Sequence, residues 1–336
     1  MKKIISTMSI ILSLLLVFAS CGTTAEETTN EATTAENTTE AYEKATINIG
    51  LLKGPTGMGA AVLLDNDEKG TAKADYNLTL AGAPDVLQAS LINNELDIAA
   101  LPTNVAAVLN AKTNGKVQIL AVNTLGVIYI MSNDESIKTV ADLKGKTVLS
   151  AGKGTTTEYV LNYILTENKL TDVTVEYASE HAEVITKAVK GDYDVVLLPE
   201  PFVTQMKGQN ADFKVVLDLT KEWKALGGSE LTMGCIAVRT AFAEENPEAV
   251  KAFIEDYTAS VNAVNADPET AGTIIEKFDI AKAKVASKAI PNCNIVVLTG
   301  EDMKTNVNNY LTVLHSSNPQ AVGGSVPADS FYCILK

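Results

Sequence analysis

The stretches VLQASLINNELDIAALP (residues 86–102) and VITKAVKGDYDVVLLP (residues 184–199) share one pattern. Each contains an amphipathic helical segment, a tight turn, an aspartate, a short apolar strand and a proline. A helix that leads into a buried strand is typical of parallel βα units. The two stretches therefore predict an α/β fold built from two similar halves.

A loop of small residues precedes each half. GLLKGPTGMGAA (residues 50–61) follows the apolar strand INIGLL, and TVLSAGKGTTTEYV (residues 147–160) has the same strand, loop and helix order. Between them we expect strands at 77–83, 96–101 and 117–124 and helices at 84–94 and 103–113. Ligands of open α/β sheets bind outside the carboxyl ends of the strands, so both loops should border a ligand cleft.

The carboxyl-terminal part of the chain does not continue the βα pattern. A strand and helix at 232–243 precede two helices with Pro247 and Pro268 in their first turns and Asn246 and Asp267 as caps. We expect these helices to return to the first lobe, which gives lobe 1 as 47–130 and 231–336 and lobe 2 as 131–230. The chain then crosses between the lobes twice, near 126–134 and 227–234, which makes a hinge.

The amino terminus predicts export. Residues 1–20 contain two lysines and then an apolar run, as in a secretory signal, and FASC resembles a bacterial lipobox in which Cys21 receives lipid. An ordinary signal with an incidental cysteine is the alternative. Residues 21–46 are mostly Thr, Glu, Ala and Asn, so we expect a flexible tether. The predicted location is extracytoplasmic and anchored to the cell membrane by lipid alone.

Composition excludes several classes of function. The net charge is −14 and Arg239 is the only arginine, which argues against binding to nucleic acid. The body has three cysteines, too few for a disulfide framework, although a pair between Cys293 and Cys333 stays open. No residues have metal-ligand spacing, and we expect neither a metal nor a cofactor.

Two longer segments resemble a known family. VADLKGKTVLSAGKGTTTEYVL (residues 140–161) and VRTAFAEENPEAVKAFI (residues 238–254) are similar to the periplasmic binding proteins for sulfonates, nitrate and thiamine pyrimidines. The resemblance covers residues 47–279. It implies the type II periplasmic-binding-protein fold, two open α/β lobes joined by a two-crossing hinge, and a monomeric receptor that delivers a small molecule to the permease of an ABC importer.

The candidate ligand-binding residues lie in the loops and at the ends of the strands. Glycines allow a ligand close to the backbone, helix starts offer free N–H groups, and threonine hydroxyls both donate and accept, one of them being expected to cap its helix. The first loop contributes Gly54, Thr56, Gly57 and Met58, and the second contributes Lys153, Gly154, Thr155, Thr156 and Thr157. Strand ends and crossings contribute Pro102, Thr103, Asn104, Asn123, Glu200 and Trp223.

Several of these residues also have purely structural interpretations. The first loop can be a plain glycine turn, Lys153 a solvated charge, Glu200 a partner of the helix dipole and Trp223 a core residue. Arg239 follows a strand and is interpreted as structural. Two helix starts suit a small oxyanion, whereas Glu200 with Trp223 suits an aromatic amine, and the sequence leaves both ligands open.

An enzyme is the main alternative to a receptor, because relatives of this fold make a thiamine pyrimidine or act in menaquinone synthesis. The cysteine-rich iron motif of the pyrimidine-making relatives is absent from the sequence. We expect His181 at a surface helix start and His315 in the tail, both away from the cleft, and therefore no enzyme activity. A tethered sensor domain is a third possibility with the same sequence features.

Overall fold

The structure is a computed structural model that describes residues 44–227 and 229–335. The predicted signal segment, the predicted lipid-attachment residue Cys21 and nearly all of the predicted tether lie outside the described residues. From Glu43 onward the chain forms one unit, which contains two sheets. None of the helices in the described part of the chain is long and apolar enough to cross a membrane.

The first sheet has six strands in the order β11-β4-β10-β3-β1-β2. β1 pairs in parallel with β2 and β3, whereas β10 is antiparallel to β3 and β4. The chain leaves this sheet after β4 and returns at β10. The bounds are Thr46–Leu52 (β1), Asp75–Ala81 (β2), Ile98–Pro102 (β3), Val117–Thr124 (β4), Gly234–Arg239 (β10) and Ile295–Leu298 (β11).

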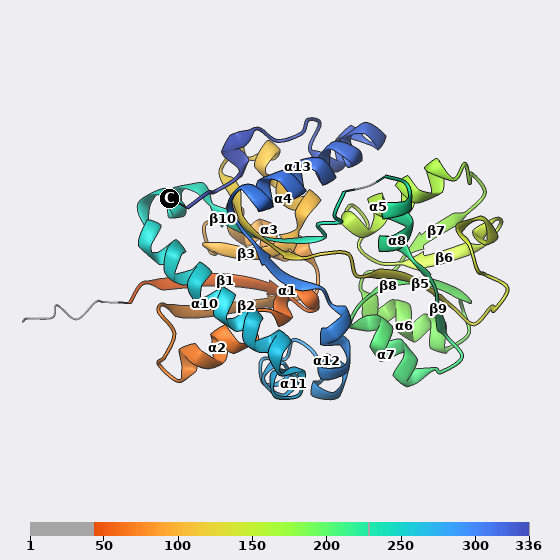
Figure 1. Cartoon of the computed structure of the whole chain (residues 1–336), viewed down its shortest axis with the longest axis horizontal. Coiled ribbons are helices and arrows are strands. Elements are labelled where there is room, and N and C mark those ends of the chain that lie inside the picture. Colours follow the sequence, from red (N-terminus) through yellow and green to blue (C-terminus); the bar gives the residue numbers. More distant parts are fainter. Residues whose placement is uncertain (1–43, 228, 336) are drawn as a thin grey trace, which may run out of the picture. The chain divides into compact units, whose positions relative to one another are not determined.

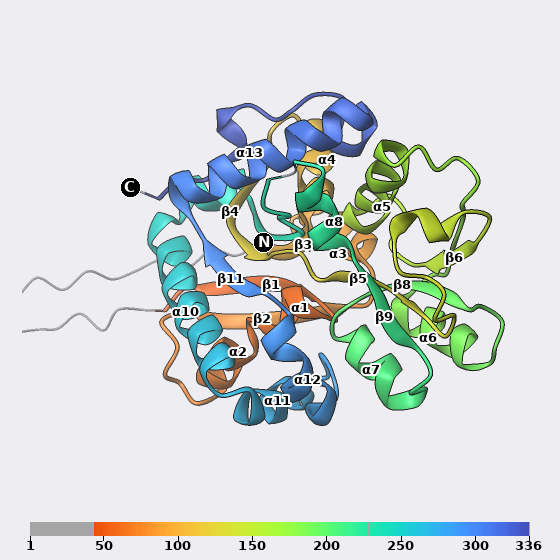
Figure 2. The same ribbon diagram turned by 45° about the vertical axis from the view of Figure 1, so that its right-hand side comes forward.

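Helices cover both faces of the first sheet (Figures 1 and 2). Alternate residues of β1, among them Ile47 and Ile49, pack under α2 (Ala61–Glu68), α10 (Pro247–Ala266), α11 (Pro268–Lys277) and α12 (Ala283–Ala289). The other face packs against α3 (Pro84–Ile92), α4 (Thr103–Lys112) and α13 (Gly300–Ser317). Because the sheet is buried on both faces, its strands are almost continuously apolar. This sheet and its helices, with the short α1 (Pro55–Met58) and α9 (Thr240–Glu245), are the first lobe.

The second sheet has five strands in the order β7-β6-β8-β5-β9. One face packs against α5 (Thr156–Glu167) and α8 (Leu219–Ala225), and the other against α6 (His181–Val189) and α7 (Phe202–Gln209). This sheet and these four helices are the second lobe. The strands are Ile128–Ser132 (β5), Thr147–Ser150 (β6), Thr174–Tyr177 (β7), Val195–Pro199 (β8) and Lys214–Asp218 (β9).

The two sheets repeat one arrangement. In the first, β1 lies between β2 and β3 and an antiparallel strand, β10, follows β3; in the second, β6 lies between β7 and β8 and the antiparallel β5 follows β8. The repeated stretches of the sequence end in β3 and β8, which occupy equivalent places. The α/β class and the similarity of the two halves therefore agree with the sequence pattern.

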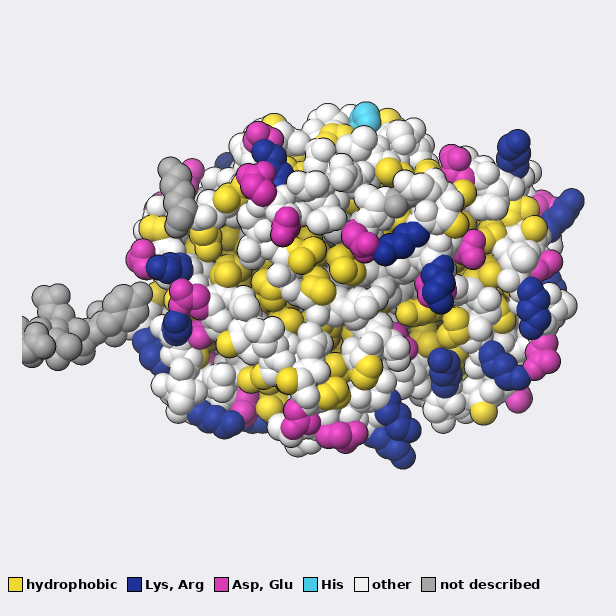
Figure 3. Space-filling model, viewed as in Figure 1, with side chains coloured by type: hydrophobic (Ala, Val, Ile, Leu, Met, Phe, Trp, Pro, Cys, Tyr) yellow, Lys and Arg dark blue, Asp and Glu magenta, His cyan; other side chains and the backbone are white. Residues whose placement is uncertain are grey.

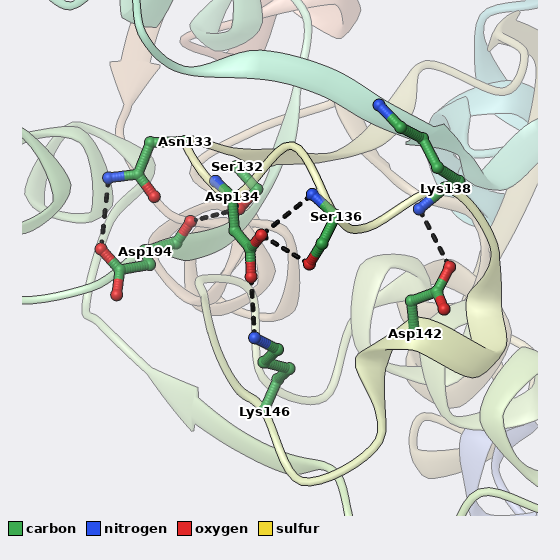
Figure 4. Close-up of polar contacts among 8 residues, drawn as sticks. All are labelled: Ser132, Asn133, Asp134, Ser136, Lys138, Asp142, Lys146 and Asp194. Carbon is green, nitrogen blue, oxygen red and sulfur yellow. Dashed lines mark hydrogen bonds and ion pairs between the residues drawn. The ribbon is translucent and has the colours of Figure 1, made fainter.

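The DLKGK motif, which carries part of the family resemblance, is structural. Lys146 at its end pairs with Asp134 at 2.8 Å, and Asp134 also accepts from the backbone of Ser136 (Figure 4). Asp142 accepts from the N–H of Lys138 and completes a capping box with Thr139. These contacts fix the segment between β5 and β6 rather than a ligand.

Other predicted structural roles have mixed outcomes. Arg239 pairs with the buried Asp97 at 2.6 Å. The Asp267 carboxylate caps α11 through the N–H of Thr270, but the Asn246 side chain makes no cap bond and donates to the Phe242 carbonyl instead. Cys235, Cys293 and Cys333 are free, so no pair forms between the last two.

Candidate ligand cleft

A cavity of about 960 Å³ lies between the two lobes. The first lobe lines it with the end of β1 and with α3 and α4, and the second lobe lines it with the residues around the starts of α5 and α6. Both β1 and β6 run toward it, so the carboxyl ends of parallel strands meet there, as the topology of open sheets requires. The described residues therefore contain an inter-lobe cleft with the volume of a small-molecule site.

Charge is arranged unevenly around this cavity. Its lysines and carboxylates, which are Lys53, Lys112, Lys153, Asp85 and Glu180, are all exposed. The buried part of the lining is apolar or carries hydroxyls, with Val127, Met233, Thr124 and Thr155 to Thr157 among its members. The cavity thus has a charged entrance and an uncharged floor. On the face shown in Figure 3, acidic and basic side chains are likewise interspersed.

The second loop reaches the cavity along its whole length. Gly152, Lys153, Gly154 and the three threonines all line it. The Thr155 hydroxyl donates to the Gly152 carbonyl at 2.6 Å, so no threonine caps α5 as expected from the sequence. Among the described residues, the N–H groups of Thr156 and Thr157 and the Thr157 hydroxyl have no hydrogen-bond partner. These groups remain available to a ligand.

Thr156 lines the cavity, but its hydroxyl is already used. It donates to Asn104 Oδ1 at 3.1 Å and accepts from the Tyr310 hydroxyl at 3.0 Å. Asn104 Nδ2 donates to the carbonyls of Gly154 and Ala321, at 3.1 and 3.2 Å. Asn104 is fully buried, so its amide binds protein rather than ligand.

The first loop contributes less than the second. Thr56 lines the cavity, but Gly57 and Met58 do not. A Cβ added to Gly57 would lie 2.2 Å from the Leu52 carbonyl oxygen, and Met58 is fully buried in the core under α10. Gly54 lies at a second cavity, described below. This loop is therefore mostly a packed structural turn.

The floor contains a hydroxyl that the sequence did not single out. Thr124, at the end of β4, is 1% exposed, lines the cavity and has an Oγ1 without a partner among the described residues. Pro102 also lines the cavity. Thr103 and Asn123 are buried outside it, and Asn123 donates to the Thr56 carbonyl at 3.2 Å. Thr124 lies on the same face of β4 as the buried Val122, but the sequence does not show which face of this strand borders the cavity.

Two proposed ligand contacts lie away from the cavity. Glu200 is 3% exposed and accepts from the N–H of Thr204 at 3.0 Å, and burial raises the pKa of its carboxyl. Trp223 is fully buried between Tyr163 and Tyr310, with ring centroids 5.0 and 5.7 Å apart, and its indole donates to Ser229. Trp223 therefore packs the core, as its structural interpretation held.

His181 is a correction to the sequence analysis, which placed it on the surface away from the cleft. It is the first residue of α6 and lines the cavity, with its ring tilted by 36° against that of Phe202 and the ring centroids 5.0 Å apart. Its Nδ1 is buried without a partner among the described residues, and burial lowers the pKa of the ring to about 4. His181 is therefore neutral at physiological pH. The sequence could not show that α6 starts at the cleft.

A second cavity of about 710 Å³ adjoins the first. The two share Lys53, Gly82, Glu180, His181 and Phe202. Glu180 reaches across from the second lobe to Gly82, where an added Cβ would lie 2.8 Å from Glu180 Oε1. The second cavity lies between α6 and α7 of one lobe and residues 276–288 of the other.

This chain resembles known proteins in both sequence and structure. The sequence model described as menaquinone biosynthesis matches residues 63–312. Among curated proteins, none matches the sequence. A solved structure from Parabacteroides distasonis, described as an ABC transporter, has 24% identity and a TM-score of 0.72, covering 87% of this chain and 100% of its own.

Two further structures have the same fold. The periplasmic aliphatic sulphonate binding protein from Escherichia coli has 17% identity and a TM-score of 0.67, covering 84% of this chain and 91% of its own. The periplasmic nitrate-binding protein from Synechocystis PCC 6803 has 14% identity and a TM-score of 0.60, covering 87% and 92%. The predicted periplasmic-binding-protein-like fold is thereby confirmed.

Proposed function

This chain belongs to the family described as menaquinone biosynthesis, but on the geometry of its cleft we propose that it is a solute-binding protein of an ABC importer. The inter-lobe cavity, with its charged entrance and uncharged floor, carries the proposal. The structures named for sulfonate and nitrate binding have the same fold, which supports a receptor. The protein would bind its solute in the cleft and pass it to a permease.

The chemistry of the floor favours an organic anion. The free N–H groups of Thr156 and Thr157 and the Thr157 hydroxyl donate hydrogen bonds to an oxyanion. Exposed Lys153 adds positive charge at the entrance, whereas Lys53 pairs with Asp279 at 2.9 Å. A cavity of about 960 Å³ is far larger than nitrate, and Val127, Met233 and Phe202 offer contact to an apolar body.

An aromatic amine fits less well. Its proposed partners were Glu200 and Trp223, and neither side chain lines the cavity. The two carboxylates that do, Asp85 and Glu180, are exposed at the entrance. A buried cation would therefore lack a buried partner, which is costly. We propose a sulfonate or carboxylate with an apolar body as the solute class.

A thermal-shift screen tests the receptor function. The purified protein would be heated with sulfonates, aromatic and aliphatic carboxylates, nitrate, pyrimidines, thiamine and flavins. A bound solute at 100 times its dissociation constant adds about 2.7 kcal/mol to the stability. We expect an organic acid to give the largest shift and mass spectrometry to recover it unchanged. No shift with any organic acid would contradict the proposed ligand class.

The membrane anchor is a separate part of the proposal. Lipid on Cys21, followed by an acidic and polar tether, would hold the receptor near its permease. Cys21→Ser should abolish incorporation of labelled fatty acid and release the protein from the membrane fraction. Retention of the label by Cys21→Ser would show that the attachment point lies elsewhere.

An enzyme remains the second candidate, because of the family match and one feature of the cleft. His181 lines the cavity, and burial lowers the pKa of its ring to about 4, so it is neutral at physiological pH and can accept a proton only as a weak base. The discriminating measurement is the fate of the ligand found in the screen. An enzyme would convert it to a new species, and His181→Gln would stop the conversion while leaving binding in place.

A further inference from the structure

The two lobes are joined along one side of the cleft. α4 and α13 of the first lobe face α5 and α8 of the second on this side (Figure 1). One continuous apolar core runs through it, from Leu109 and Met303 of the first lobe to Leu161 and Leu219 of the second. These four side chains are each at most 1% exposed.

Polar contacts inside this interface are mutually satisfied. Asn104 of α4 uses both amide hydrogens and its oxygen, with Gly154, Ala321 and Thr156 as partners. Tyr310 of α13 donates to the same Thr156 hydroxyl and packs on Trp223 of α8. Asn104, Thr156 and Tyr310 are each at most 1% exposed. Hydrogen bonds in such a dry site are strong, and leaving one partner unpaired is costly.

The opposite side of the cleft is different. α7 and α12 touch there, but the second cavity of about 710 Å³ separates much of α6 and α7 from residues 276–288. Its polar side chains include Gln205, Gln209, Lys284 and Lys288, whose side chains make no hydrogen bond or ion pair within the described ranges. This side therefore lacks a comparable set of buried bonds.

We propose that Asn104, Thr156 and Tyr310 form an inter-lobe bolt that keeps the cleft assembled without ligand. Asn104 and Tyr310 are positioning residues in this arrangement, since both act on the cavity through Thr156. The carboxyl-terminal helix α13 thus acquires a function, because it supplies one third of the bolt. The lobes pivot about this side, and the α7–α12 side moves more.

The consequence for binding rests on the proposed function. A receptor whose binding-competent form is already dominant loses little affinity to the cost of closing. A variant that opens the cleft weakens the apparent affinity in proportion to the assembled fraction that remains. The bolt itself is measured without any ligand, so its test does not depend on the identity of the solute.

Distances between spin labels in the ligand-free protein test the bolt. One pair, Asn162→Cys with Asn309→Cys, reports on the bolted side, and a second, Gln209→Cys with Lys288→Cys, reports on the opposite side; all four residues are exposed. Both pairs are placed in a Cys333→Ser background. We expect one narrow distance for the first pair and a broader distribution for the second. Equal breadth, or two populations in the first pair, would overturn the proposal.

Two substitutions and a control sharpen the test. Tyr310→Phe removes one bond of the bolt and should shift the assembled-to-open ratio about fivefold. Asn104→Asp replaces a donor by a carboxylate that faces two carbonyl groups and should open the first pair further. Tyr163→Phe removes a hydroxyl from the same aromatic cluster without a bond across the lobes and should change nothing. If Tyr310→Phe gives the same distances as Tyr163→Phe, the bolt does not exist.

Discussion

The two loops that precede the repeated halves have the same position in the fold but different surroundings. The loop at residues 53–59 follows β1 and is largely packed, with Gly57 against Leu52 and Met58 in the core. The loop at residues 152–157 follows β6, lines the cavity throughout and keeps free N–H groups. Topology places both loops at the cleft, but packing behind each loop decides how much of its backbone faces the cavity.

The largest expected effect comes from the packed loop. Gly57→Ala would place a methyl group 2.2 Å from the Leu52 carbonyl oxygen, which is backbone and cannot move aside easily. We expect a loss of about 3 kcal/mol or more in the free energy of unfolding, measured by urea denaturation. If the variant unfolds with its midpoint at the same urea concentration as the wild type, this loop is not a packed turn.

Neighbouring threonines of the second loop provide a matched pair. Thr156→Val breaks two hydrogen bonds across the lobes and should cost about 2 kcal/mol of stability. Thr157→Val removes a hydroxyl with no protein partner, so stability should stay near wild type while affinity for the stabilising acid falls about fivefold. Calorimetry measures the affinity, and urea denaturation measures the stability. A lower stability for Thr157→Val than for Thr156→Val would contradict this assignment of the two hydroxyls.

His181, which lines the cavity at the start of α6, should make the stability of the fold depend on pH. His181 has a folded pKa of about 4, below the ordinary 6.5, so the unfolded chain binds more protons between these values. Stability should therefore fall as the pH drops from about 6.5 to about 4, by about 1.5 kcal/mol since the ring is partly reached by water at the cavity. His181→Gln should remove this part of the slope. An unchanged slope would show that other groups titrate.

The smallest effect is expected for the second loop's own glycine. Gly154 has φ of +77° but open space where a Cβ would stand. Gly154→Ala should cost about 1 kcal/mol, only the strain of the left-handed backbone. Set against Gly57→Ala, this measures how much more tightly the first loop is packed. Equal losses for the two alanines would remove the distinction between the loops.

The sequence predicted the architecture better than the site. Periodicity placed β4 at 117–124 and the two repeated halves, because apolar alternation and turn residues are local signals. It could not show that α13 would bring Tyr310 to Thr156, since that contact joins residues 154 positions apart. For the same reason Asn104 and Glu200 looked like ligand contacts: their strand ends were placed correctly, but the directions of their side chains depend on tertiary packing.

A crystal structure of the protein with the organic acid that stabilises it most tests the central claim directly. We expect the unchanged acid in the inter-lobe cavity, with its acidic group within hydrogen-bond distance of the Thr157 hydroxyl and of the N–H groups that begin α5. An acid bound outside this cavity, or held by the first loop alone, would contradict it.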